Sequence, residues 1–308
     1  MKRKGFKGIL LLLSMLFALT GCSVSEATQH GMAVDTIQAE DVLLRVDFLN
    51  VGQADCALLS TNGHYMVIDG GNNGDADTIL SYLEGQGVEK LDAVVGTHPH
   101  EDHIGSLDAI INHFDVDAVY MPKIMHTSKT FEDVLDAVAN KGLKIKSPSP
   151  GDTIDFNGLE IEVLGPQREY KDFNNNSIVL KVNAGETAFL FTGDAEETAE
   201  KDILQAGYDL QADVLKVGHH GSSTSTSAEF LEAVSPSYGV ISCGKDNKYG
   251  HPHQSALDRL SAAGVQVLRT DEMGTVILQS DKEQIYAVGR TVETPLERYI
   301  AKLKNWVA

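Results

Sequence analysis

The segment HPHEDH, from His98 to His103, places three histidines and two acidic residues within six positions. It follows directly on the apolar, strand-like run LDAVVGT (91–97), and apolar side chains recur after it at helical spacing as far as Phe114. A strand that ends in a polar cluster and continues into a helix is typical of α/β folds, which bind ligands at the carboxyl ends of strands. We therefore expect an α/β fold with a functional site at this strand end.

The residue types in this segment favour a metal site over a polar helix cap. Imidazole and carboxylate together are the ligands preferred by zinc, manganese or iron. On an extended turn, His98 and His100 point the same way, so that one metal can bind both. Asp102 and His103 come where the chain turns into a helix, and they can face a second metal. Glu101 falls out of phase and is expected to face solvent.

Two later strand ends supply what the first cluster lacks. Asp194 ends the run TAFLFTGD (187–194), and a carboxylate there can bridge two metals. His219 follows the next strand, in ADVLKVGHHGSS. The sequence therefore predicts a dinuclear site. The expected ligands are His98, His100 and Asp194 on one ion, and Asp102, His103, Asp194 and His219 on the other.

The remaining pattern predicts an internally sandwiched α/β architecture and not a single Rossmann sheet. Strand-like runs at 43–51, 56–60 and 65–71 indicate an antiparallel start. Predicted helices and strands then alternate in two similar halves, the second beginning near residue 177. Polar clusters stand at strand ends in both halves.

These motifs resemble the metallo-β-lactamase superfamily, whose HxHxDH signature matches His98 to His103. The runs VDFLNVGQADCALL, VIDGG, NNNSIVLKV, FLFTGD, VLKVGHHGS and NKYGHPH occur in the order found in the hydrolase domain attached to ComEC, the DNA-uptake channel of competent bacteria, and in its free-standing relatives. The similarity covers about residues 43–288. It implies a four-layer αβ/βα sandwich, a two-metal centre at the sheet edges, and phosphodiester hydrolysis by metal-activated water.

The resemblance also implies roles for residues around the ligands. Asp69 matches an aspartate that orients a metal-binding histidine. Asp55 is expected near the metals, with a turn at the strand end as the alternative. His219, and not His220, matches the ligand because it directly follows the strand and glycine; His220 then donates to substrate or supports a ligand. Many members carry a third histidine on the first metal, but the segment before Ser177 reads DFNNN, and Ser177 is expected beside the ligands.

Catalytic and substrate-binding residues are expected around this centre. Asp102, His220 and His251 are the candidate catalytic residues. His251 either hydrogen-bonds a phosphoryl oxygen or belongs to a helix cap with exposed imidazoles. Lys123, His126 and Lys129 are candidate substrate contacts, because they fall in a region where such enzymes vary; an ordinary helix entry is the alternative. The expected cofactors are two divalent ions, zinc or manganese, although the missing histidine leaves the occupancy of both sites open.

The first 22 residues have the pattern of an export signal. Four basic residues precede an apolar run (9–19) that is shorter than a membrane span, and LTGC ends at Cys22. This resembles the lipobox of bacterial lipoproteins, which implies lipidation at Cys22 and attachment outside the cytoplasmic membrane, or secretion if the lipobox is not used. We expect a flexible tether at 23–40, a hydrolase domain at 41–290 and a C-terminal helix at 291–308.

Net charge limits the substrates that the surface can attract. The formal charge of −19 argues against a broad basic groove for nucleic acid, so metals would have to hold any phosphate. The leading expectation is an extracytoplasmic phosphodiesterase acting on DNA. One alternative is an esterase for a small phosphodiester of the cell envelope, such as phosphocholine on teichoic acid. Another is a tethered binding protein without catalysis. The sequence leaves the oligomeric state open.

Overall fold

The computed structural model describes residues 39–288. The expected export signal with Cys22, the tether at 23–40 apart from its last two residues, and the C-terminal helix at 291–308 lie outside the described residues.

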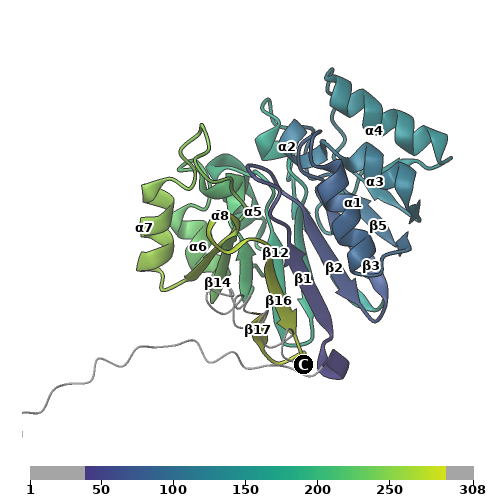
Figure 1. Cartoon of the computed structure of the whole chain (residues 1–308). Helices are drawn as coiled ribbons and strands as arrows, with labels where there is room; N and C mark the ends of the chain where they lie inside the picture. The colour runs from purple at the N-terminus through teal and green to yellow at the C-terminus, as the bar shows by residue number, and fades with distance from the viewer. Residues whose placement is uncertain (1–38, 289–308) are drawn as a thin grey trace, which may run out of the picture. The chain divides into compact units, whose positions relative to one another are not determined.

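Two large β-sheets form the centre of the described domain (Figure 1). The eight-stranded sheet contains, in spatial order, β17 (Ile285–Val288), β16 (Val276–Ser280), β1 (Leu44–Phe48), β2 (Ala57–Thr61), β3 (His64–Ile68), β5 (Ala93–Val95), β7 (Val119–Tyr120) and β8 (Ile145–Lys146). The seven-stranded sheet contains β15 (Gln266–Arg269), β14 (Tyr238–Ile241), β13 (Val214–Lys216), β12 (Thr187–Phe191), β11 (Val179–Ala184), β10 (Leu159–Gly165) and β9 (Thr153–Phe156). A small third sheet pairs β4 (Lys90–Leu91) with β6 (Asp115–Val116).

Strand direction changes within each large sheet. β1, β2 and β3 are antiparallel, as predicted, while β3, β5, β7 and β8 are parallel to one another. In the other sheet, β9 to β12 are antiparallel and β12 to β15 are parallel. β1 does not lie at an edge, because it also pairs with β16 from the far end of the described chain. Parallel strands direct several carboxyl ends to one edge of the domain.

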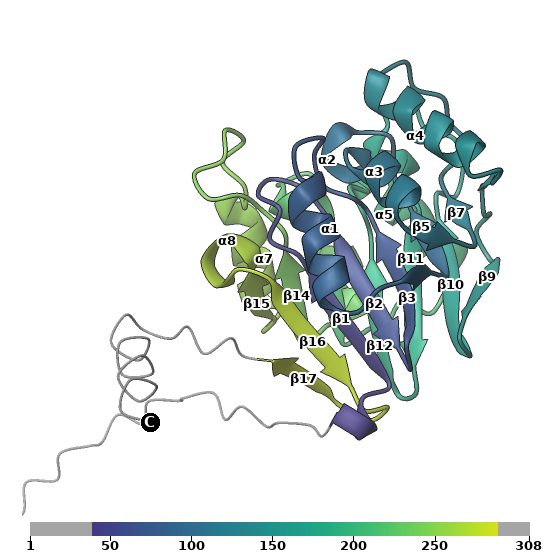
Figure 2. The same ribbon diagram turned by 45° about the vertical axis from the view of Figure 1, so that its right-hand side comes forward.

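Helices cover the outer face of each sheet, so that the layers run helix, sheet, sheet, helix (Figures 1 and 2). The expected four-layer sandwich is confirmed. The first sheet is covered by α1 (Ala76–Gly85), α3 (Leu107–His113) and α4 (Lys129–Asn140), and the second by α5 (Glu197–Ala206), α6 (Ala228–Val234) and α7 (Gln254–Ala262). Short helices are α2 (Glu101–Ile104), α8 (Thr270–Met273) and the 3₁₀ turns η1 (Ala39–Asp41), η2 (Asn174–Asn176) and η3 (Gly218–Gly221).

The central strands are apolar on both faces because each face meets a different layer. In β12, Phe189 and Phe191 belong to the core between the sheets, whereas Ala188 and Leu190 pack under the helices. β2 alternates in the same way, with Leu59 between the sheets. Strands that are buried on both sides appear as continuous apolar runs in a sequence, which is the pattern that predicted them.

The predicted helix from Ile104 to Phe114 is broken in the structure. The backbone N–H of Gly105 donates to the carbonyl of Gly71, and that of Ser106 donates to the carbonyl of Gly70. A Cβ on Gly105 would lie 2.2 Å from the carbonyl carbon of Asn72, so only glycine permits this approach. The loop after β3 thus takes over hydrogen bonds that would have continued the helix, and it fixes the histidine segment against β3.

No helix within residues 39–288 combines the length and the apolar character that crossing a bilayer requires.

Candidate metal centre

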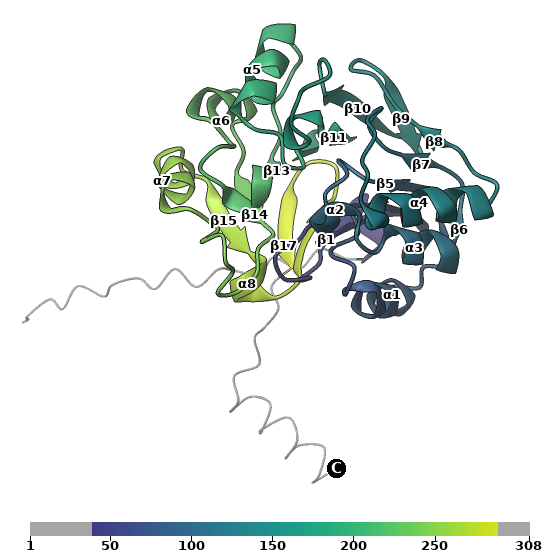
Figure 3. The same cartoon turned by 90° about the horizontal axis from the view of Figure 1, so that it is seen from above.

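Polar side chains from both sheets converge at one edge of the sandwich. Figure 3 looks down on this edge, with α2 near the middle, between the helices of the two sheets. The residues concerned follow strand ends: Asp55 after β1, Asp69 after β3, His98 to His103 after β5, Asp194 after β12, His219 and His220 after β13, and Ser242 after β14. The strand-end arrangement predicted from the sequence is present.

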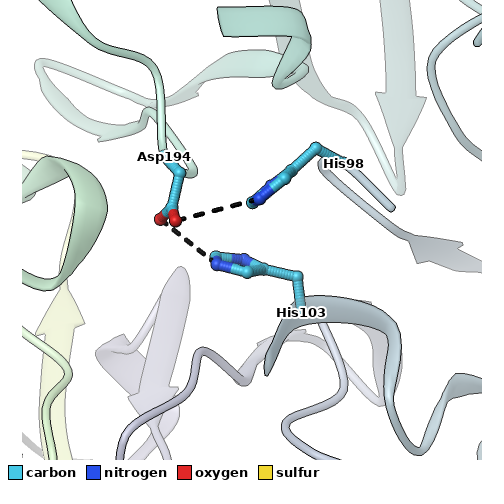
Figure 4. A group of neighbouring side chains, drawn as sticks. All are labelled: His98, His103 and Asp194. Carbon is cyan, nitrogen blue, oxygen red and sulfur yellow. Dashed lines mark ion pairs between the residues drawn. The ribbon is translucent and has the colours of Figure 1, made fainter. Parts of the chain in front are cut away.

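His98, His103 and Asp194 form the centre of this cluster, and both rings point at the carboxylate (Figure 4). Nε2 of His103 lies 3.2 Å from Oδ1 of Asp194, and Nε2 of His98 lies 3.8 Å from Oδ2. Nδ1 of His100 is 3.0 Å from Nε2 of His98. Asp194 therefore lies between His98 and His103, and His100 lies beside His98.

The second expected ligand group contains His220 where the sequence suggested His219. Nε2 of His220 lies 3.3 Å from Oδ2 of Asp102 and 3.7 Å from Oδ1 of Asp194, and the residue is buried. The side chain of His219 is 23% exposed, with Nδ1 3.3 Å from Oε1 of Glu196 and Nε2 3.6 Å from Oδ2 of Asp194. The geometry favours His220 as the ligand and leaves His219 on the cleft wall.

The local backbone explains this difference from the expectation. β13 ends at Lys216, and both His219 and His220 have positive φ, 50° and 53°. Two successive left-handed residues turn the chain sharply. Counting residues from the glycine therefore could not identify the histidine that enters the interior.

Three buried ligand atoms in this cluster make no hydrogen bond of acceptable geometry within the described residues. They are Nε2 of His103, Oδ1 of Asp194 and Nε2 of His220. Their nearest polar neighbours are one another and Asp102, at 3.2 to 3.7 Å, so the cluster has unused hydrogen-bonding capacity that a bound ion would satisfy. Imidazole nitrogen and carboxylate oxygen are donors suited to zinc, manganese or iron. The residues thus fit the divalent ions that the sequence predicts.

Hydrogen bonds behind two of the histidines hold these ligand atoms toward the centre. Nδ1 of His103 lies 2.8 Å from Oδ2 of Asp69, which also accepts from the hydroxyl of Thr97. Nδ1 of His220 donates to the carbonyl of Ser242 at 3.0 Å. In both rings Nδ1 carries a proton, so Nε2 is the atom available to a metal. Asp69 occupies the orienting position expected for it.

Asp55 connects His220 to a buried lysine that the sequence analysis missed. Oδ1 of Asp55 lies 3.2 Å from Nδ1 of His220, and Oδ2 lies 2.7 Å from Nζ of Lys216. The side chain of Lys216 is only 5% exposed. A lysine is almost never buried without a partner. Its place within the apolar strand DVLKV was the signal that could have revealed it.

The segment before β11 also contributes to the centre. Oγ of Ser177 lies 3.3 Å from Nδ1 of His98 and accepts from the backbone N–H of Asp194 at 3.1 Å. Asn174, in the segment where many superfamily members have a histidine, lines the cleft, and its Oδ1 is buried without a hydrogen bond. Asn174 is therefore a second residue that the sequence analysis missed.

The cluster is strongly coupled electrostatically. Burial alone would lower the pKa of His220, but Asp194 and Asp55 raise it to about 10. Burial alone would raise the pKa of Asp194, but the positive charges of His103 and His220 outweigh this effect and hold it well below its usual range. Burial lowers the pKa of His98 well below its ordinary value. Burial alone would also lower the pKa of His103, but Asp194 and Asp69 raise it well above its ordinary value. Without metal, His103 and His220 are therefore imidazolium groups where cations are expected, and metal binding would release their protons.

A cleft of about 350 Å³ opens onto these ligands. His251 lies in its wall, and burial, together with neighbouring histidines, lowers its pKa to about 4. The amide oxygen of Gln53 accepts from the N–H of Gly244, so its amide nitrogen faces Nδ1 of His251 at 3.3 Å. His251 is thus neutral near pH 7 and carries its proton on Nε2, which makes it a hydrogen-bond donor. Glu101, expected to face solvent, is exposed and also lines the cleft.

None of the three expected substrate contacts is among the residues that line the cleft, although His126 lies near His100. The ring of His126 lies 6.5 Å from that of His100 and 4.6 Å from that of Phe173, and Lys123 is exposed on the same segment. Lys129 instead pairs with Asp133 on the surface of α4 and does not line the cleft. The position of Lys129 supports the alternative that this part of the segment is an ordinary entry into a helix.

Comparisons with known proteins agree with this architecture. A model of the metallo-beta-lactamase superfamily matches residues 49–245, more than half of the chain. The chain is 32% identical to ComE operon protein 3 of Bacillus subtilis over 250 residues, 75% of this chain and 32% of that protein. It is 33% identical to competence protein ComA of Neisseria gonorrhoeae over 230 residues, 74% of this chain and 31% of that protein. The expected resemblance to competence proteins is confirmed.

These matches cover most of this chain but a much smaller part of each curated relative. The chain spans about a third of the length of these two curated relatives. Among solved structures, the metallo-beta-lactamase fold protein YhfI from Bacillus subtilis matches with a TM-score of 0.53 and 12% identity, covering 77% of this chain and 99% of that chain, which shows a shared fold. The chain therefore belongs to the metallo-beta-lactamase superfamily, with the candidate ligand set of its metal-dependent hydrolases.

Proposed function

We propose that this chain is a metal-dependent phosphodiesterase that cleaves DNA outside the cytoplasmic membrane. The observation that carries the proposal is the convergence of three buried ligand atoms without a hydrogen bond, from His103, Asp194 and His220, beside a cleft that Asp194 and His220 line. Membership of the superfamily supports hydrolysis, and the names of the competence-related relatives support DNA as the substrate. The first 22 residues support the location.

The residues that would hold two ions are distributed between both sheets. His98, His100 and Asp194 would hold the first, with Asn174 beside them. The second would be held by Asp102, His103, Asp194 and His220. Divalent ions in such a site supply Lewis acidity, which activates water and neutralises negative charge on phosphoryl oxygens. This local positive charge offsets the acidic surface around it.

The chain's own side chains prepare the site for this chemistry. Asp69 orients the ring of His103, and Ser242 with Asp55 orients the ring of His220, so that Nε2 of each ring faces the centre. His251 is neutral and presents an N–H in the cleft wall, where it can donate to a phosphoryl oxygen. Ser177 holds Asp194 through its backbone N–H.

The experiment that tests the function compares three substrates under defined metal loading. The chain is stripped of metal with EDTA and reconstituted with Mn²⁺ or Zn²⁺, then offered single-stranded DNA, duplex DNA and bis(p-nitrophenyl) phosphate. We expect cleavage of DNA only after reconstitution. His100→Ala should lower turnover by more than about 10–100-fold, because loss of even an outer partner of a metal ligand costs that much.

A matched histidine variant controls for nonspecific effects. His113 is an exposed residue of α3 that pairs with Glu84 and does not line the cleft, so His113→Ala should retain activity. Turnover of the small diester with intact DNA would favour an esterase of the cell envelope. No turnover of any substrate by the fully metal-loaded chain would refute the proposal and favour a binding protein without catalysis.

The proposed location has its own test. If Cys22 carries lipid, Cys22→Ser should move the chain from the membrane fraction to the soluble fraction of the cell envelope. An unchanged distribution would refute lipid attachment at that residue without affecting the hydrolase proposal.

A further inference from the structure

Exposed apolar side chains are few in the described domain, and one of them lies at the cleft. Residues 39–288 expose three large apolar side chains, Met125, Tyr249 and Val288. Tyr249 is 52% exposed and lines the cleft together with Asp102, His220 and His251. An aromatic ring that remains half in water beside candidate metal ligands is available to a substrate.

The loop that carries Tyr249 is held in one conformation by its own side chains. Oδ1 of Asn247 accepts from the backbone N–H groups of Tyr249 and His251, at 3.1 and 3.0 Å. Its Nδ2 donates to the carbonyls of Gly244 and His251. The ring of Tyr249 lies nearly parallel to that of His251, with centroids 5.7 Å apart and an angle of 23°. Because the loop is already ordered, little conformational entropy is lost when a ligand stacks there.

The charges beside this ring favour an anionic ligand. Lys245 and Lys248 are exposed on the same loop, and Nζ of Lys248 lies 5.0 Å from the centroid of the Tyr249 ring. One carboxylate, Asp246, lies between them in sequence, so the loop has a net charge of +1 within an acidic protein. An ammonium over the ring repels a quaternary ammonium such as choline, and it attracts phosphate.

We propose that Tyr249 is a stacking platform for a nucleobase next to the scissile phosphate, with Lys248 binding a flanking phosphate. The inference rests on the proposed phosphodiesterase function and deepens it, because it specifies a substrate that contains bases. Stacking on one aromatic ring tolerates every base, since each base has a π face. The site would therefore accept DNA of any sequence, provided that it is unpaired near the cut.

The test separates stacking from every other use of the ring. The full chain and its Tyr249→Phe, Tyr249→Ala and Lys248→Met variants are given a single-stranded oligonucleotide and an oligomer of equal length and charge whose sugars lack bases. We expect the preference in kcat/KM for the base-bearing oligomer to fall about tenfold in Tyr249→Ala, within the range for loss of a stacking ring. Tyr249→Phe keeps the ring and should keep the preference.

Binding provides a readout that does not need a loaded enzyme. Fluorescence anisotropy of the labelled oligonucleotide with the metal-free chain should show weaker binding for Tyr249→Ala and not for Tyr249→Phe. Lys248→Met should weaken binding of both oligomers and reduce the slope of log Kd against log salt by about 1, as expected for one lost phosphate contact.

Failure of the inference differs from failure of the proposed function. Equal losses on both oligomers in Tyr249→Ala would mean that the ring only supports His251, and an unchanged preference would mean that it contacts no base; either result overturns the inference. A wild-type chain that turns over no phosphodiester refutes the proposed function itself, whatever the variants do.

Discussion

Replacing Lys216 with methionine should destabilise the domain because it leaves Asp55 buried without its cation. The two side chains are 5% and 6% exposed and their charged atoms are 2.7 Å apart. Methionine fills a similar volume without charge, so the change isolates the electrostatic effect. Removal of one partner from a buried ion pair costs about 3–5 kcal/mol.

The local surroundings place the expected cost at the lower end of that range. His220 remains 3.2 Å from the other oxygen of Asp55, and its raised pKa keeps it positively charged in metal-free protein at pH 7. We therefore expect a loss of about 3 kcal/mol. For a domain of this size, about 1 kcal/mol shifts the Tm by about 2–4 °C, so the Tm should fall by about 6–12 °C.

A second buried lysine offers a matched control. Lys181 is also 5% exposed, but its partner Asp209 is 72% exposed. Water can solvate Asp209 after Lys181→Met, so the loss should be about 1 kcal/mol or less.

Thermal unfolding of metal-free protein at pH 7, followed by circular dichroism, compares the two single variants and Lys216→Met/Asp55→Asn. The double variant should recover at least half of the lost Tm. Equal Tm values for Lys216→Met and Lys181→Met would refute the reasoning.

Three further predictions follow from the site and its supports. His220→Ala should lose about one bound ion per chain, measured by mass spectrometry of metals after dialysis, and His219→Ala should lose none; equal losses would contradict the ligand assignment. In metal-free protein the pKa of His220 is raised from 6.5 to about 10, so its stabilising contribution is complete below pH 6.5 and disappears as the pH rises toward 10. Urea unfolding should therefore show lower stability at pH 10 than at pH 6, and equal stability would argue against these ion pairs. Gly105→Ala should destabilise the domain by several kcal/mol, because the added Cβ would overlap the Asn72 backbone. Gly85→Ala, at a position with open space in α1, should stabilise it by about 0.5–1 kcal/mol. Similar unfolding midpoints for the two variants would contradict the packing argument.

Much of the fold and the centre of the site could be predicted from local pattern. His98, His103 and Asp194 follow apolar runs, and the carboxyl ends of parallel strands share an edge, so their proximity follows from the strand assignment. The side chains of β12 alternate between the two apolar cores, which explains why that strand was predicted. The strand ends at Phe191, earlier than the expected residue 194.

What sequence could not supply depends on contacts between distant segments. The break at Gly105 is due to hydrogen bonds with the loop after β3, which no helical periodicity reveals. The choice of His220 over His219 depends on two consecutive left-handed residues. The role of Lys216 depends on Asp55, which is far away in sequence and close only after both sheets have assembled.

The position of β1 between β2 and β16 has a consequence for the order in which the protein can be completed on the ribosome. Val46 lies opposite Leu278, so β1, the first strand of the described domain, keeps an open edge until almost the last strand of that domain has emerged. Contacts so distant in sequence slow folding, and an unpaired strand edge can recruit other chains. A nascent or truncated chain without residues 276–288 should therefore aggregate through β1, even though every residue of the metal centre has already been made.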